Sequence, residues 1–254
     1  MSVPSAREDR RWIDADDRTF FTGFVSAVPG WLEEYAALRT MDLLALQENA
    51  RITGPLLEIG VFMGRYFAVL LRSAVRAGER IVGVDTFQYF QPEEIAERMA
   101  GMAAAETMQF VRRRSVDLSA DELRTILGGE PRFVSIDGSH ERDDVRSDLV
   151  LCEEILAPLG IVAVDDFLNP VTLGVNDGVH RFFEQPRRLA PFAYTANKLF
   201  LSRPAAAARY VAAFESHVVA DDREPRSAAF RSNLPAYRAN VEQRLWGSTL
   251  LVVP

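Results

Sequence analysis

Acidic residues end four of the apolar segments that the sequence predicts to be strands. These residues are Glu58, Asp85, Asp137 and the pair Asp165-Asp166. Carboxylates accept hydrogen bonds in pairs and bind cations, so they are natural ligand-binding groups. An acid that follows a strand also caps the next helix, and each of these residues has that second interpretation on its own. Acidic residues at four strand ends together favour a ligand site at that edge of the sheet.

A glycine turn lies between the first predicted strand and the helix after it. Gly60 and Gly64 frame this turn in the run Glu58-Ile-Gly-Val-Phe-Met-Gly64. A dinucleotide-binding fingerprint that began at Gly60 would need glycine at its third and sixth positions, where this chain has Phe62 and Arg65. The spacing therefore disfavours NAD or FAD.

Short apolar runs alternate with helical patterns from about residue 55 onward. Several of the runs are continuously apolar, which is typical of strands covered on both faces. Repeated strand–helix order predicts an α/β fold with a doubly wound, mostly parallel sheet of seven strands. The predicted strands span 55–60, 81–85, 108–112, 133–137, 161–165, 198–202 and 248–253. Ligands of such sheets bind beyond the carboxyl ends of the strands, where the acids lie.

The flanks of this alternating region are helical. Residues 1–50 are predicted to form an N-terminal helical cap or lid, and residues 51–254 are predicted to form the main domain. Within the main domain, residues 204–246 predict an Ala-rich helix and an exposed charged loop inserted before the last strand. We expect both flanks to cover one domain rather than to form domains of their own.

Composition excludes several classes of protein. The 254 residues carry a net charge of −7, which argues against a nucleic-acid surface. No apolar run reaches the roughly 20 residues that span a bilayer. The only cysteine, Cys152, excludes an internal disulfide and a cysteine-based zinc site. With a polar N-terminal segment, these features predict a cytoplasmic protein with no membrane or nucleic-acid partner.

The glycine turn resembles motif I of the class I S-adenosylmethionine-dependent methyltransferases. The resemblance implies that Gly60 and Gly64 bring backbone close to the methionine part of the cofactor, near Glu58 and Met63. It further implies that Asp85, which ends the second strand, accepts hydrogen bonds from both ribose hydroxyls. Many members have an acid after the third strand, where this chain has Arg113-Arg114-Ser115-Val116-Asp117. Ser115 is our prediction for the adenine contact, with Asp117 as the second choice.

The segments Phe133–His140 and Gly160–Phe167 resemble the metal-dependent small-molecule O-methyltransferases, of both the macrolide-sugar type and the catechol and caffeoyl-CoA type. That resemblance implies that Asp137, Asp165 and Asp166 hold Mg²⁺, with Asp137 also near the cofactor and the reaction. His140, three residues after Asp137, then becomes the general base. Lys198, the only lysine, falls within a predicted strand, which leaves the base to histidine. His140 has a second interpretation, as the cap of the helix that begins near Glu141.

Other residues near these segments carry weaker signals. Asn169 is predicted to orient substrate or water beside the acids. His180 is more typical of a structural residue, and its other interpretation is a second base. Aromatic residues in the predicted lid regions suit an apolar or planar acceptor, although packing explains them as well. These aromatic residues are Trp31, Tyr35, Phe87, Tyr89, Phe90 and Phe167.

These observations together predict an enzyme that transfers a methyl group from S-adenosylmethionine to a hydroxyl of a small molecule, such as a natural-product or sugar acceptor, with Mg²⁺ and possible homo-oligomers. A metal-free methyltransferase acting on oxygen, nitrogen or carbon is the nearest alternative. A relative of the cephalosporin-hydroxylase type and a non-catalytic cofactor-binding or assembly protein also fit the motifs. A nicotinamide oxidoreductase fits least, because the glycines it needs are missing.

Overall fold

The computed structural model describes residues 10–253, and the chain divides into two compact units. The first unit ends at Pro131 and the second begins at Arg132. The boundary predicted at residue 50 falls inside the first unit, where the N-terminal helices pack on the helix after the glycine turn. Among the described residues, no helix is both long and apolar enough to cross a membrane.

The first unit opens with the short helices of the predicted cap. They are α1 (Arg11–Asp14), α2 (Asp17–Gly23), the 3₁₀ turn η1 (Val25–Ala27) and α3 (Glu34–Asn49). Asp16 caps α2 by accepting a hydrogen bond from the Thr19 amide. Arg72, which lies on the helix α4 (Arg65–Ala77), is buried against this region and pairs with Asp17 at 2.7 Å. The cap is therefore anchored by a buried ion pair as well as by its apolar side chains.

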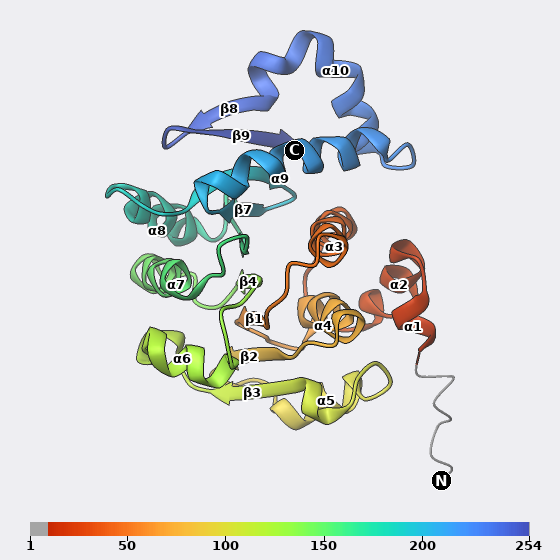
Figure 1. Ribbon diagram of the computed structural model, residues 1–254, viewed down its shortest axis with the longest axis vertical. Helices are drawn as coiled ribbons and strands as arrows, with labels where there is room; N and C mark the ends of the chain where they lie inside the picture. The colour runs from red at the N-terminus through yellow and green to blue at the C-terminus, as the bar shows by residue number, and fades with distance from the viewer. Residues whose placement is uncertain (1–9, 254) are drawn as a thin grey trace. The chain divides into compact units, whose positions relative to one another are not determined.

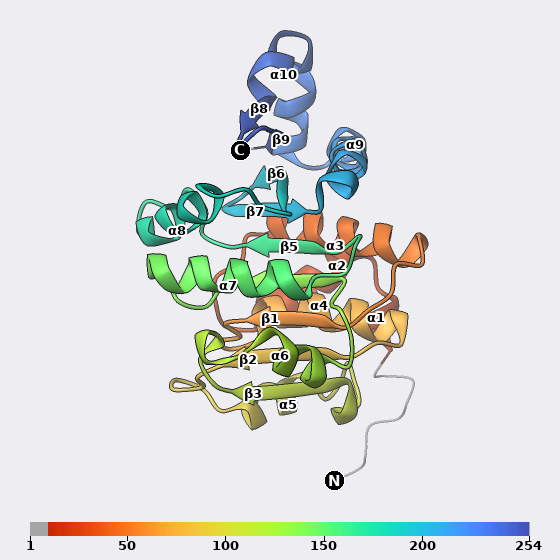
Figure 2. The same cartoon turned by 60° about the vertical axis from the view of Figure 1, so that its left-hand side comes forward.

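Three parallel strands form the sheet of the first unit, in the order β3-β2-β1. They are β1 (Leu56–Ile59), β2 (Ile81–Asp85) and β3 (Met108–Arg112). Helix α4 covers one face of these strands and α6 (Ala120–Leu127) covers the other, as Figures 1 and 2 show. The unit also contains α5 (Pro92–Met99) and the 3₁₀ turns η2 (Ala105–Thr107) and η3 (Ser115–Asp117). Both faces are covered, which explains why β1 is apolar at all but one of its positions.

The second unit has six strands in the order β4-β5-β7-β6-β9-β8. They are β4 (Phe133–Ile136), β5 (Ile161–Val164), β6 (Ala190–Thr195), β7 (Lys198–Ser202), β8 (Glu242–Leu245) and β9 (Ser248–Val253). β4 and β5 are parallel, whereas β7 is antiparallel to both of its neighbours. The helices are α7 (Arg142–Ile155), α8 (Leu173–Phe183), α9 (Pro204–Ala220) and α10 (Pro225–Val241). Helix α7 packs on β4, and α9 packs on β6, β7 and β9 on the opposite face (Figure 2).

The α/β fold class is confirmed, but the strand count differs from the prediction. The described residues contain nine strands where seven were predicted, because β6 and β8 were missed. β6 contains Pro191, which cannot donate to a ladder, and its register shifts between Pro191 and Ala193. β8 is mostly polar and gives no apolar run. The segment 204–246 consists of α9, α10 and β8, with its charged loop shortened to residues 221–224.

Candidate functional site

The glycine turn of the first unit has the left-handed backbone that its sequence predicts. Gly60 and Gly64 have φ angles of 86° and 89°, conformations that side chains rarely adopt. A β-carbon on Gly64 would also lie 2.9 Å from the side chain of Ile95. Both glycines are therefore required by the loop itself, which leaves its backbone accessible at the carboxyl end of β1.

Asp85 fixes the conformation of this loop. The backbone amides of Val61 and Phe62 donate hydrogen bonds to its Oδ2 at 2.8 and 3.0 Å. The Phe87 amide donates to Oδ1 at 2.8 Å. A carboxylate has about four acceptor positions, so these bonds and the ribose contact predicted for Asp85 are compatible. The loop contacts are a feature that the sequence alone did not reveal.

The other predicted cofactor residues of the first unit gather at the same edge of its sheet. Glu58 is buried in β1, and the Met63 carbonyl accepts a hydrogen bond from Arg98 at 2.8 Å. Ser115 and Asp117 begin and end the 3₁₀ turn η3, which follows β3. Because the three strands are parallel, their carboxyl ends and these residues face one side. Their contacts with a cofactor remain predictions.

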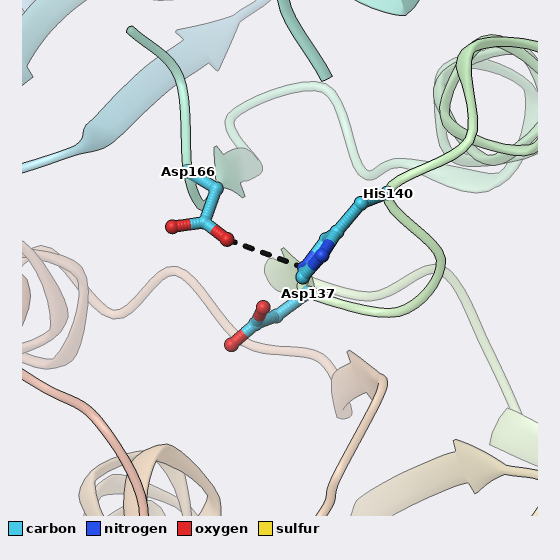
Figure 3. A group of neighbouring side chains, drawn as sticks. All are labelled: Asp137, His140 and Asp166. Atoms are coloured by element: carbon cyan, nitrogen blue, oxygen red, sulfur yellow. Dashed lines mark ion pairs between the residues drawn. The ribbon is translucent and has the colours of Figure 1, made fainter. Parts of the chain in front are cut away.

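Asp137, His140 and Asp166 come together at the carboxyl ends of β4 and β5 in the second unit. One ligand atom from each lies within 4.8 Å of the others, an arrangement that could hold a metal ion. The His140 Nε2 atom lies 3.2 Å from Asp166 Oδ2 (Figure 3). The parallel pairing of β4 with β5 explains this convergence, because it brings the two segments after the strands to one edge.

His140 does not serve as the helix cap that was its second interpretation. Helix α7 begins at Arg142, and its N-cap residue is Glu141. The Glu141 amide donates a hydrogen bond to Ser139 Oγ at 3.1 Å instead. The His140 side chain turns to Asp166 and is 48% exposed, so a ligand could reach it.

Asp166 is held in an unusual conformation. Its φ is 58°, in the left-handed region that non-glycine residues rarely adopt, and strain of this kind is concentrated at functional sites. Asn169 Nδ2 donates a hydrogen bond to its Oδ1 at 2.7 Å. Asn169 therefore lies beside the acids as the sequence predicted, and it orients one of them.

Asp165 lies next to Asp137 in the same pocket, and it also pairs with a residue that the sequence analysis set aside. Its Oδ2 lies 2.9 Å from Lys198 Nζ, which comes from the start of β7. Burial works against the charged form of Asp165, but the ammonium outweighs it, and the pKa of this carboxyl lies below its usual value. Of the three predicted metal ligands, the structure thus brings Asp137 and Asp166 together with His140, and pairs Asp165 with Lys198.

Two glycines of α8 bring that helix close to the His140 loop. A β-carbon on Gly174 would overlap the carbonyl oxygen of His140. A β-carbon on Gly178 would lie 2.7 Å from the carbonyl oxygen of Arg142. A small pocket at the His140 loop is lined by Asp137, His140 and Asp165 and by apolar side chains. The residues of the pocket are Ile136, Asp137, Gly138, Ser139, His140, Val145, Val164, Asp165 and Val175.

The aromatic residues of the predicted lids have different environments. In the first unit, Trp31 is 87% exposed and stacks on Phe62 of the glycine turn, which contacts Phe90 edge-on. Tyr89 is also exposed, whereas Tyr35, Phe87 and Phe167 are buried and serve packing. In the second unit, His180 contacts the ring of Trp246, which fits the structural interpretation of this histidine.

Comparison with protein families identifies part of the chain. A family model described as a methyltransferase domain matches residues 57–167. Over these residues, which are less than half of the chain, the sequence is similar to a methyltransferase domain. These residues contain the glycine turn and the cluster of Asp137, His140 and Asp166, and the resemblance to class I methyltransferases that the sequence indicated is confirmed. No curated protein matches the chain by sequence.

Solved structures of methyltransferases share the fold of this chain. CalS11, a TDP-rhamnose 3′-O-methyltransferase of calicheamicin biosynthesis, is 17% identical with a TM-score of 0.55, over 80% of this chain and 96% of its own. The O-methyltransferase NovP is 15% identical with a TM-score of 0.55, and the match covers 66% of this chain and 80% of NovP. MycE of mycinamycin biosynthesis, in complex with Mg and S-adenosylhomocysteine, is 15% identical with a TM-score of 0.52. The match covers 74% of this chain and 54% of MycE. At these identities the likeness establishes the fold.

Proposed function

We propose that this protein transfers the methyl group of S-adenosylmethionine to a hydroxyl oxygen of a small molecule. The observation that carries the proposal is the group formed by Asp137, His140 and Asp166 at the strand ends of a methyltransferase domain. An imidazole beside a carboxylate is suited to remove the proton of a hydroxyl. CalS11, NovP and MycE, which share the fold, are methyltransferases, and the first two act on oxygen by name.

The cofactor would bind at the glycine turn of the first unit. Its sulfonium supplies a methyl group that is open to attack by a nucleophile. The Asp85 carboxylate accepts hydrogen bonds from two backbone amides of the turn and so holds its conformation. The left-handed glycines keep side chains away from the backbone there. Gly60, Gly64 and Asp85 are thus the proposed core of the cofactor site.

A divalent cation is compatible with the acidic group. The carboxylates of Asp137 and Asp166 form a donor set that is open on its remaining sides, which suits Mg²⁺ and Mn²⁺ because these ions retain water or bind substrate oxygens. Asp137 and Asp166 would hold such an ion, which would lower the pKa of an acceptor hydroxyl. The Mg²⁺ in the MycE structure supports this part of the proposal by analogy of fold.

His140 is the proposed general base, and its contact with Asp166 assigns a role to each ring nitrogen. Nε2 faces the carboxylate, so a neutral ring would place its hydrogen there and leave the lone pair on Nδ1. Nδ1 would accept the hydroxyl proton while the oxygen forms its bond to the methyl carbon. The carbon–sulfur bond breaks and its electron pair stays on sulfur. Asp166 would stabilise the imidazolium that results.

The proposal is tested by methyl transfer to a panel of hydroxyl acceptors, followed through release of S-adenosylhomocysteine. We expect His140→Ala to lower kcat by about 10²- to 10⁴-fold. His140→Ala should leave S-adenosylhomocysteine affinity within about twofold, because His140 is assigned to proton transfer rather than to cofactor binding. Activity of His140→Ala equal to that of the wild type would exclude the base. Failure of the wild-type protein to bind S-adenosylhomocysteine in calorimetry would overturn the function as a whole.

A methyltransferase that needs no metal is the second candidate, and one contact favours it. Lys198 already neutralises Asp165, one of the three acids that the family resemblance assigns to the cation. Exhaustive chelation distinguishes the two candidates. Loss of activity that returns with Mg²⁺ supports the metal-assisted reaction, whereas unchanged activity supports the metal-free one.

A further inference from the structure

Lys198 is the only lysine of the chain and is almost completely buried. Its side chain is 1% exposed, and its ammonium lies 2.9 Å from Asp165 Oδ2. A buried ammonium is costly unless it is paired, so the contact with Asp165 is what allows the charge at this position. The pair lies directly beside Asp166, which belongs to the proposed chemical site.

The backbone fixes Lys198 in this place. β5 and β7 are antiparallel, and their last register pair is Val164 with Leu199, so Asp165 and Lys198 come next on the two strands. The turn before Lys198 is a tight hairpin, since Ala196 and Asn197 both have positive φ. The Asn197 carbonyl accepts a hydrogen bond from the Phe167 amide at 2.9 Å. The hairpin thereby locks the segment that contains Asp165 and Asp166 to the strand that contains Lys198.

We propose that Lys198 is a positioning residue that removes Asp165 from the carboxylates available to a cation. The family resemblance assigns the ion to Asp137, Asp165 and Asp166. In this structure the ligand atoms that converge belong to Asp137, His140 and Asp166. The inference rests on the cation proposed above, and it changes the set of residues that would hold it.

Charge balance supports the same assignment. With all three carboxylates ionised, they and the one ammonium carry a formal charge of −2, which a divalent cation would neutralise. Without the ammonium the same acids would carry −3. Lys198 therefore weakens the attraction between the cluster and a cation, and Asp165 lies between its partner Lys198 and the neighbouring Asp137.

The test measures Mn²⁺ binding by electron paramagnetic resonance in three variants whose folding is checked by circular dichroism. Lys198→Met removes the ammonium, and Lys198→Gln removes the charge but keeps a hydrogen-bond donor. The double variant Lys198→Met/Asp165→Asn removes both charges of the pair. We expect the folded single variants to bind Mn²⁺ at least about tenfold more tightly than the wild type, because repulsion is lost and Asp165 is released. The double variant should bind within about threefold of the wild type.

The outcomes separate this inference from the proposed function. A folded double variant that binds Mn²⁺ more than tenfold more weakly than the wild type would make Asp165 a ligand and overturn the inference. If the wild type binds no Mn²⁺ but a single variant does, Lys198 keeps the ion out: the inference holds and the metal-assisted reaction fails. If neither the wild type nor any folded variant binds Mn²⁺, the inference fails, while S-adenosylhomocysteine binding still tests the methyltransferase.

Discussion

At the scale of the residue, Asp85 shows how one side chain can fix the backbone of a proposed ligand site. Its two oxygens accept hydrogen bonds from Val61, Phe62 and Phe87. The resemblance to motif I of the class I methyltransferases implied that Asp85 is a ribose ligand. It did not predict the loop contacts, because they depend on where the turn folds back, which no pattern of residue types encodes.

Replacement of Asp85 by asparagine should weaken cofactor binding through the loop. Asparagine has one acceptor oxygen, so its NH₂ group must face backbone amides on one side and leave donors unpaired. We expect S-adenosylhomocysteine affinity to fall at least about tenfold. The Val61 and Phe62 amides should exchange with deuterium faster in the cofactor-free variant. Asp121→Asn, the same change at an exposed position of α6, is the control and should leave affinity within about twofold. Unchanged amide exchange in Asp85→Asn would show that the loop does not need this carboxylate.

Cys152 provides a probe of the second unit. It is completely buried on α7, and burial raises the pKa of its thiol well above the usual value. We expect no reaction with a disulfide reagent such as Ellman's reagent in the native protein, and one thiol per chain after denaturation. Stoichiometric labelling of the native protein within minutes would show that α7 opens readily.

At the scale of the element, α8 depends on small residues where it crosses the His140 loop. The Gly174 α-carbon approaches the His140 carbonyl so closely that a methyl group has no space. A sequence reader could have found this signal in the Gly-x-x-x-Gly spacing of residues 174 and 178, which places both glycines on one helix face. The strands and most helix starts were predictable because apolar runs and caps are local, as for Ser119 at the start of α6.

Gly174→Ala should displace α8 from the His140 loop. The overlap with backbone cannot be relieved by turning a side chain, so we expect a loss of about 1–3 kcal/mol in the free energy of unfolding. Urea denaturation measures this loss, and kcat for methyl transfer should fall with it as His140 moves. Gly101→Ala is the matched control, because a β-carbon there meets no atom within 4 Å. Equal stability of the two variants would refute the close packing of α8.

At the scale of the whole molecule, the sequence predicted the α/β class and the acids at the strand ends. It did not predict which partner each of the two adjacent acids after β5 contacts. Asp165 and Asp166 are adjacent, and their residue types are identical. Only the antiparallel return of β7 decides that Asp165 meets Lys198 while Asp166 meets His140. Such long-range pairings follow from the tertiary fold, which is also why β6 and β8 were missed.

The Lys198–Asp165 pair should make the stability of the protein depend on pH in a defined direction. The pKa of Asp165 is lower in the folded state than in the unfolded chain, so the pair stabilises the fold above the unfolded pKa of about 3.9. This contribution is lost as the pH falls through the lower, folded pKa. Lys198→Met leaves a buried charge unpaired, and we expect it to cost roughly 3–5 kcal/mol at pH 7. Urea denaturation of both proteins from pH 7 to pH 3 should show this difference shrink as Asp165 of the variant becomes protonated. A difference that stays constant across that range would mean that the ion pair does not stabilise the fold.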